Sequence, residues 1–275
     1  MAIQGISASG NRGAHLDNRR PRIMLVTPSR IAYRGLLGQL GPRKFGGWAF
    51  YLALHKPFKI SINGGAQQSE RIVLVPPYMS HHVSTQDREI AKILVESETI
   101  GRLCGEQSPY LETLMNTPAR RLDLEARLRD AFEQSLHKPV DFDQKFFGGP
   151  LPARVLDSRI CHTLIKLNAV DGYKITLSAC AAEAKLSFSR FSHLFCAETQ
   201  TTFRSLRAWK RARRLLSMIV DPPSLVNVAL DAGYADSTHF SHVIREFYGC
   251  SPRDIYAGSR HLQVISQGSL QTAMA

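Results

Sequence analysis

Two segments near the C-terminal end of this 275-residue chain follow the same plan. The tripeptide Phe191-Ser192-His193 returns 49 residues later as Phe240-Ser241-His242. Each copy follows a helix-capping residue, Thr176 in the first and Ser224 in the second. Between the capping residue and the tripeptide, both segments have a small residue and then a turn, and the tripeptide lies on the second helix. The sequence therefore predicts an internal structural repeat of two helix-turn-helix units.

The second helix of each unit divides into an apolar and a polar side. Apolar residues at helical spacing are expected to face the core, and every aromatic residue on these helices is assigned there. The apolar set is Phe191, Leu194 and Phe195 in the first unit and Phe240, Val243, Ile244 and Phe247 in the second. A recognition helix lies in the major groove of double-stranded DNA, so the outward polar residues are the candidate reading positions. They are Ser189, Arg190, Ser192, His193, Ser237, Thr238, His239, Ser241 and His242.

A basic segment joins the two units. Residues 201–220 predict one long helix with an apolar stripe and several arginines on its other sides. Such a helix would hold two recognition helices at a fixed separation, and about 34 Å would place them one turn of DNA apart. Arg211 and Arg214 on this helix are expected to contact phosphates rather than bases.

The region from about 155 to 257 resembles the AraC/XylS family of transcription regulators. The most specific part is Ala229–Pro252. Framework positions of the family signature fall on Ala229, Gly233, Tyr234, Phe240, Phe247, Gly249 and Pro252. The resemblance implies two units reading adjacent major-groove segments, a role leaning toward activation, and RNA polymerase as a partner.

Four residues depart from the family pattern. Lys185 and Gln200 stand where the family usually has glycine. His193 and His242 stand where it very often has arginine, and a neutral histidine binds phosphate or guanine less strongly.

The N-terminal half shows strand character. Phe58, Ile60 and Ile62 alternate with polar residues, and the apolar runs 48–54, 71–75 and 90–95 are separated by turn signals. Short strands at this spacing predict an antiparallel sandwich or barrel. The region 71–83 also resembles the turn of cupin-like sensor barrels, which implies a pocket for a small-molecule effector. His55, His81 and His82 could bind a metal, but ordinary packed or exposed histidines are favoured, so no metal is expected.

The fold class is therefore α+β, with a cupin-like antiparallel β-barrel and helices followed by an all-α domain of two helix-turn-helix units joined by a long helix. We expect a flexible tail at 1–22, a sensor and dimerisation domain at 23–147, a linker at 148–153, the DNA-binding domain at 154–260 and a flexible tail at 261–275. The apolar residues between 120 and 136 would form a homodimer interface or pack onto their own barrel. They are Leu124, Leu128, Ala131 and Phe132.

Composition limits the function classes. Lysine and arginine total 35 against 23 acidic residues, and the net charge of +12 favours a polyanionic partner. Five cysteines without a CxxC motif indicate neither a disulfide framework nor a zinc finger. No apolar run is long enough for a membrane span and no secretory signal is present, so a cytoplasmic location is expected. An enzyme built on the barrel and an architectural DNA-compacting protein are the competing classes. Common catalytic and nucleotide-binding motifs are missing, so no enzyme activity or cofactor is expected.

Overall fold

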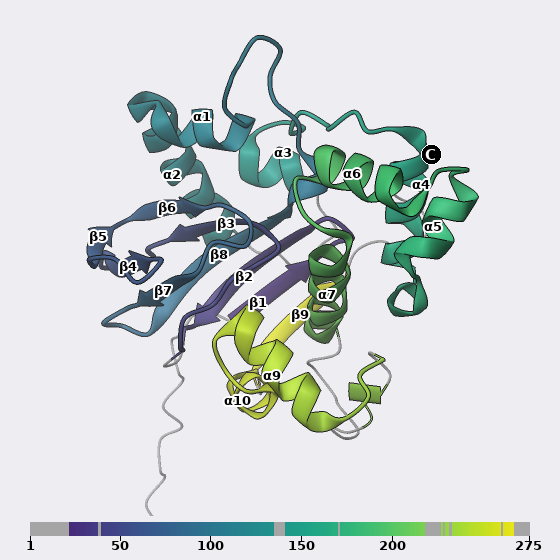
Figure 1. Ribbon diagram of the computed structural model, residues 1–275. Coiled ribbons are helices and arrows are strands. Elements are labelled where there is room, and N and C mark those ends of the chain that lie inside the picture. The colour runs from purple at the N-terminus through teal and green to yellow at the C-terminus, as the bar shows by residue number, and fades with distance from the viewer. Residues whose placement is uncertain are drawn as a thin grey trace, which may run out of the picture.

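The computed structural model describes residues 22–37, 40–134, 141–169, 171–217, 227, 229–230, 233–259 and 261–266 (Figure 1). The strands are β1 Arg22–Val26, β2 Arg30–Leu36, β3 Gly47–Leu52, β4 Phe58–Ile62, β5 Gln68–Glu70, β6 Ile72–Val75, β7 His81–Ser84, β8 Glu89–Glu96 and β9 Leu262–Ser266. The α-helices are α1 Tyr110–Asn116, α2 Pro118–Glu133, α3 Phe142–Phe147, α4 Ser158–Asn168, α5 Leu177–Glu183, α6 Phe188–Thr199, α7 Phe203–Arg214, α9 Ser237–Tyr248 and α10 Pro252–Gly258. The 3-10 helices are η1 Ser97–Thr99, η2 Gly172–Lys174 and η3 Leu215–Ser217.

The described strands form two sheets. The larger sheet has the order β6-β3-β8-β2-β1-β9, and the smaller one has the order β5-β4-β7. Neighbouring strands are antiparallel, except that β9 pairs in parallel with β1. Strand β8 shows how the sheet separates two cores, since successive side chains of a strand point to opposite faces. Ile90 and Leu94 belong to one apolar cluster, and Ala91, Ile93 and Val95 belong to the other.

Helices α1, α2 and α3 cover one face of the larger sheet (Figure 1). The ring of Phe132 lies 5.1 Å from that of Phe146, and Phe147 lies 5.6 Å from Phe50 on β3. The apolar residues of α2 that we considered for dimerisation, Leu124, Leu128, Ala131 and Phe132, are all buried in this cluster. They therefore pack onto their own sheet, which was the other alternative, and offer no face to a second copy.

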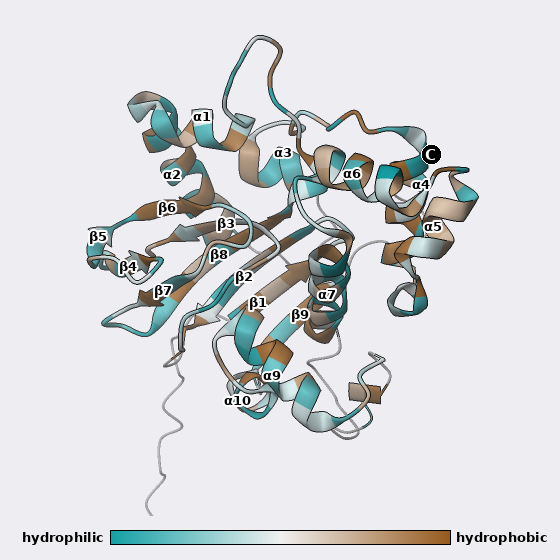
Figure 2. Cartoon of the chain, in the orientation of Figure 1, coloured by the Kyte–Doolittle hydropathy of each residue, from teal (hydrophilic) through white to brown (hydrophobic). Residues whose placement is uncertain are grey.

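The opposite face of the sheet shares its core with the C-terminal helices. Phe45 lies 6.0 Å from Trp209 of α7 and 5.9 Å from Tyr248 of α9, measured between ring centroids. Gly46 leaves the room for this contact, because a Cβ atom there would come within 2.2 Å of the Trp209 ring. Figure 2 shows the hydrophobic residues concentrated along the strands of the larger sheet. The two halves of the chain are therefore joined by an apolar core.

Buried ion pairs also join the sheet to helix α7. Glu96, at the end of β8, accepts a hydrogen bond from Nε1 of Trp209 at 3.0 Å. Its carboxylate also lies 2.7 Å from Nζ of Lys210 and 2.7 Å from Nε of Arg213. The Lys210 ammonium reaches Glu98 of η1 at 2.5 Å. We call Glu96, Glu98, Trp209, Lys210 and Arg213 the interlock, because it attaches α7 to the sheet.

The interlock keeps its charges despite burial. Burial opposes ionisation of Glu96, but the charges of Lys210 and Arg213 outweigh it and hold the carboxyl pKa below its ordinary value. Burial likewise opposes the charge on Lys210, and the two glutamates raise its pKa instead. The attraction therefore operates across the whole neutral pH range.

Three features differ from the sequence-based expectation. The larger sheet ends at β6 and β9 and is open within the described residues, so the predicted barrel is not closed. Strand β9 lies inside the predicted flexible tail and hydrogen bonds to β1, so this part of the tail is ordered. Leu151 of the predicted linker is buried against the sheet, and Ala153 bridges to Ile100. The N-terminal tail before Arg22, the cap Ser224 and residues 267–275 lie outside the described residues.

Replacing Glu96 by glutamine should strongly destabilise the protein. The variant would leave two buried cations without their main counter-charge, and breaking a buried ion pair costs about 3–5 kcal/mol. Urea unfolding monitored by circular dichroism measures this loss. The lowered pKa makes this contribution present above the ordinary carboxyl pKa of 4.5 and lost as the pH falls through the folded value. The difference between wild type and variant should therefore shrink in acid.

Asp123→Asn is the matched control. Asp123 is 69% exposed and pairs with Arg127 one helical turn away, so its removal should cost less than about 0.5 kcal/mol. Equal unfolding midpoints for the two variants would show that the interlock does not stabilise the fold.

Candidate nucleic-acid interface

The first helix-turn-helix unit consists of α5 and α6. The Thr176 hydroxyl accepts the N–H of Ala179 at the start of α5, and the Ser187 hydroxyl accepts the N–H of Arg190 at the start of α6. These bonds satisfy backbone donors that a helix leaves unpaired at its N-terminus. Phe191 and Phe195 of α6 are fully buried, as the spacing predicts. The opposite side of α6 is therefore left to solvent.

The second unit ends in α9. Its first helix is described only at Asn227, Ala229 and Leu230, and Ala229 is buried as expected for the close contact between the helices. Asp236 caps α9 by accepting the N–H of His239 at 2.7 Å. The Tyr234 ring packs 5.1 Å from that of Phe240 and fixes the turn before the helix.

The predicted reading residues lie on α6 and α9, the two helices that the sequence assigned to them. Seven are exposed, and Ser192 and Ser241 are half-buried. The exposed ones are Ser189, Arg190 and His193 on α6 and Ser237, Thr238, His239 and His242 on α9. Each set occupies the side of its helix away from the buried aromatic residues. Their contacts to DNA bases stay predictions.

The two linker-helix arginines are held within the chain. Arg211 donates to the carbonyl of Gly233 and stacks over Tyr234, with 3.9 Å between guanidinium and ring centroid. Arg214 donates to the carbonyl of Ala169 just after α4. Arg211 thus links α7 to the turn of the second unit, and Arg214 links it to the helix preceding the first. Their expected phosphate contacts also remain predictions.

Lys185 and Gln200, which stand where the family usually has glycine, have left-handed backbone, as do the glycines at the equivalent positions of the second unit. Lys185 in the first turn has φ of 54°, and the corresponding Gly233 of the second has 77°. Gln200 after α6 has φ of 59°, and Gly249 after α9 has 73°. The first unit therefore adopts the backbone of the second while carrying side chains that disfavour it.

One aromatic residue contradicts the expectation that all aromatic residues on these helices face the core. Phe188, the first residue of α6, is 58% exposed. Side chains in a helix lean toward its N-terminus, so a residue in the first turn projects past the end of the helix. Residue spacing alone does not reveal this.

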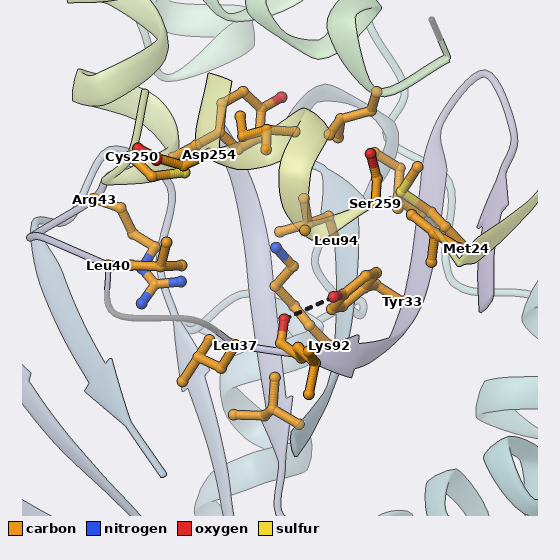
Figure 3. Close-up of a pocket in the computed structure, with 18 of the residues that line it drawn as sticks. Met24, Tyr33, Leu37, Leu40, Arg43, Lys92, Leu94, Cys250, Asp254 and Ser259 are labelled. Carbon is orange, nitrogen blue, oxygen red and sulfur yellow. Dashed lines mark hydrogen bonds between the residues drawn. The ribbon is translucent and has the colours of Figure 1, made fainter. Parts of the chain in front are cut away.

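Sequence reasoning also missed a pocket of about 350 Å³ between the sheet and the second unit (Figure 3). Met24, Tyr33 and Leu94 contribute from β1, β2 and β8, and Cys250, Ile255 and Ser259 contribute from the chain after α9. The Tyr33 hydroxyl donates to the carbonyl of Leu36 at 2.7 Å, which turns its polar end aside. The walls are therefore mostly apolar and come from both halves of the chain.

Three basic residues line this pocket, the exposed Arg88 and the two described next, Lys92 and Arg43. The Lys92 ammonium sits 4.5 Å from the centroid of the Phe45 ring, and no carboxylate in the described part of the chain pairs with it. Burial, followed by the nearby charge of Arg43, lowers the pKa of Lys92 to about 7. Arg43 is 2% exposed, and its Nε has no hydrogen-bond partner in the structure described. A lone lysine in the apolar run 90–95 was the available sequence signal.

The histidines of the N-terminal half do not form a cluster. His81 is buried, with one ring nitrogen 2.8 Å from the Tyr51 hydroxyl and the other 2.9 Å from the Met79 carbonyl. Burial lowers the pKa of His81 to about 4, so its ring is neutral at neutral pH. His55 lies at the surface beside Glu89. The described residues contain no group of three side chains suited to a metal ion.

Comparisons with known proteins agree with this geometry. A helix-turn-helix domain family matches residues 180–257, and no curated protein matches the sequence. A crystal structure of an apo ToxT variant from Vibrio cholerae is 10% identical, covers 84% of this chain and 97% of its own, and has a TM-score of 0.54. A second ToxT structure from the same organism is 11% identical, with 83% and 98% covered and a TM-score of 0.51. Both likenesses concern the fold.

A DNA-binding transcriptional dual regulator from Escherichia coli K-12 is 30% identical, covers 36% of this chain and 93% of its own, and has a TM-score of 0.31. No helix among the described residues has the length and apolar character needed to cross a bilayer. Residues 180–257 therefore form a helix-turn-helix domain of the AraC type, and the fold of the chain is similar to that of ToxT.

Substituting Lys185 by glycine should stabilise the protein. A side chain in left-handed backbone costs about 1–2 kcal/mol, and part of this returns when glycine removes the Cβ atom. We expect a gain of about 0.5–1 kcal/mol and a higher melting temperature by circular dichroism. Ala184→Gly is the control, because Ala184 has right-handed helical backbone and glycine there should destabilise. A lower melting temperature for Lys185→Gly would contradict this account.

Proposed function

We propose that this protein regulates transcription by binding one operator through both helix-turn-helix units at once. The observation that carries the proposal is the pair of capped recognition helices, each with its predicted reading residues on the solvent side. Helix α7 connects them and is attached to the start of the first unit through Arg207 and to the turn of the second unit through Arg211. Two fixed recognition helices suit adjacent major-groove segments on one face of the DNA.

The regulator is expected to act as an activator, in the cytoplasm, with RNA polymerase as its protein partner and as a homodimer in the working state. The family resemblance supports these features. A dimer would use a surface other than the apolar side of α2, because that side is buried within the chain. The α2 residue Leu122, 67% exposed, lies outside that cluster.

We further propose that a small effector controls the regulator from the pocket between the sheet and the second unit. A ligand in this pocket would touch β8 and the segment after α9 together. It can shift an equilibrium only through a difference in its contacts between two arrangements of the protein. A site shared by the sensor sheet and a DNA-binding unit meets that requirement.

The pocket favours a largely apolar molecule with one acidic group. Its volume of about 350 Å³ suits a small ligand. Lys92 and Arg43 place two cationic side chains in it, and the Arg43 Nε still lacks an acceptor. Asp254 stands at its exposed rim and is already bonded to Ser251. A carboxylate buried beside Lys92 and Arg43 would satisfy donors that the protein alone leaves unused.

DNA binding is tested with an operator selected from random duplexes by the full-length protein. Arg190→Ala should weaken binding to that operator by about 1–3 kcal/mol and change binding to random DNA little. Arg214→Ala should weaken both alike and lower the salt slope by about one, as expected for a phosphate contact. Mobility shifts over a range of salt concentrations measure both effects. Failure to enrich any sequence would reject the proposed function.

Effector binding is tested with dodecanoate against 1-dodecanol, which has the same chain without the charge. Wild type should prefer dodecanoate, measured by displacement of a fluorescent apolar sulfonate. Because the pKa of Lys92 is about 7, an anion must bring a proton to Lys92 above that pH. Its affinity should therefore fall up to about tenfold per pH unit above 7 and level off below.

Lys92→Gln should abolish the pH dependence and weaken the preference for dodecanoate, because Arg43 remains in the pocket. Lys59→Gln, at an exposed position on β4, should change neither. Equal binding of the acid and the alcohol by wild type would argue against an acidic effector.

A further inference from the structure

Phe188 has no assigned role in the fold. It is 58% exposed and opens the recognition helix α6. Single exposed apolar residues are common on protein surfaces, so its position must decide whether it means anything. The other large exposed apolar side chains of the described residues lie on other elements. They are Leu122, Val155, Ile165 and Leu230.

The position of Phe188 places it at the edge of the reading face. Residues three and four apart on a helix are neighbours, so Phe188 lies between the buried Phe191 and the half-buried Ser192, which borders the reading residues. Ser187 and Ser189 flank it in the chain, and both are exposed. Serine side chains are short, which lets the start of α6 approach the base edges and leaves the phenyl ring protruding furthest.

The chemistry of the major groove limits what a phenyl ring can read there. Base edges in the groove present hydrogen-bond donors and acceptors, and thymine alone adds an apolar group, its C5-methyl. We infer that Phe188 selects thymine at one operator position by packing against this methyl group. The inference rests on the DNA-binding function proposed above.

The internal repeat predicts where this selection occurs. The 49-residue offset that relates Phe191 to Phe240 relates Phe188 to Ser237. Ser237 is exposed at the first position of α9 but has no apolar side chain. Methyl recognition by this position should therefore occur in the half of the operator that α6 contacts and not in the half that α9 contacts.

The experiment uses the full-length protein and its selected operator. Each thymine is replaced in turn by deoxyuridine, which removes only the methyl group. Burying one methyl group is worth about fourfold in affinity, so wild type should lose about that factor at one position in the α6 half-site. Phe188→Ala should bind the thymine operator correspondingly less well and should not distinguish thymine from deoxyuridine at that position.

Two further variants sharpen the result. Phe188→Leu keeps an apolar side chain and should retain part of the discrimination. Leu122→Ala removes an exposed apolar side chain from α2 and should leave the wild-type pattern unchanged. Circular dichroism checks that each variant is folded, which the exposure of Phe188 leads us to expect.

Several results would overturn the inference. One is the same affinity for thymine and deoxyuridine operators at every position in wild type. Another is undiminished discrimination by Phe188→Ala. If Phe188→Ala binds the operator like wild type but fails to activate a reporter, Phe188 contacts a protein instead. If no operator can be selected at all, the DNA-binding proposal itself fails. Equal affinity for the thymine and deoxyuridine operators would overturn only the role of Phe188.

Discussion

The carboxylate of Glu96 is the group on which the arrangement of the two halves depends. It is 2% exposed and receives Trp209, Lys210 and Arg213 from a single helix. A buried carboxylate without partners would be very costly, as would the two buried cations. The sheet and α7 therefore need each other in this position, and Gly46 admits the indole ring that completes the contact.

This contact and the pocket lie on one face of one strand. Lys92 and Glu96 are four residues apart on β8, so both side chains point toward the C-terminal half. Lys92 faces the pocket beside the second unit, and Glu96 faces the helix that joins both units. Strand β8, in the middle of the sheet, thus carries two of the polar groups through which the N-terminal half meets the C-terminal half.

Local rules predicted much of the helical half. The caps Thr176 and Asp236 and the buried phenylalanines follow from patterns within a few residues, and the structure places them as expected. Pairings between distant segments escaped those rules. Strand β9 is recognisable only beside β1, because its register depends on an edge over two hundred residues away. From the sequence alone, Lys92 would be taken for a surface residue. The fold instead places Phe45 and Arg43, which lie between β2 and β3, beside it.

The repeat itself explains why the two units differ in sequence at equivalent backbone. A Cβ atom at Gly233 would meet the Tyr173 ring at 2.2 Å, and one at Gly249 would meet the Gly41 carbonyl at 2.4 Å. The corresponding Lys185 and Gln200 are exposed, so side chains there cost only the backbone preference. The second unit needs glycine because other segments lie against both positions, and one of those segments belongs to the N-terminal half. The first unit is not confined at these positions. Contacts from the N-terminal half therefore reach the second unit at the left-handed backbone that ends α9 as well as around the pocket.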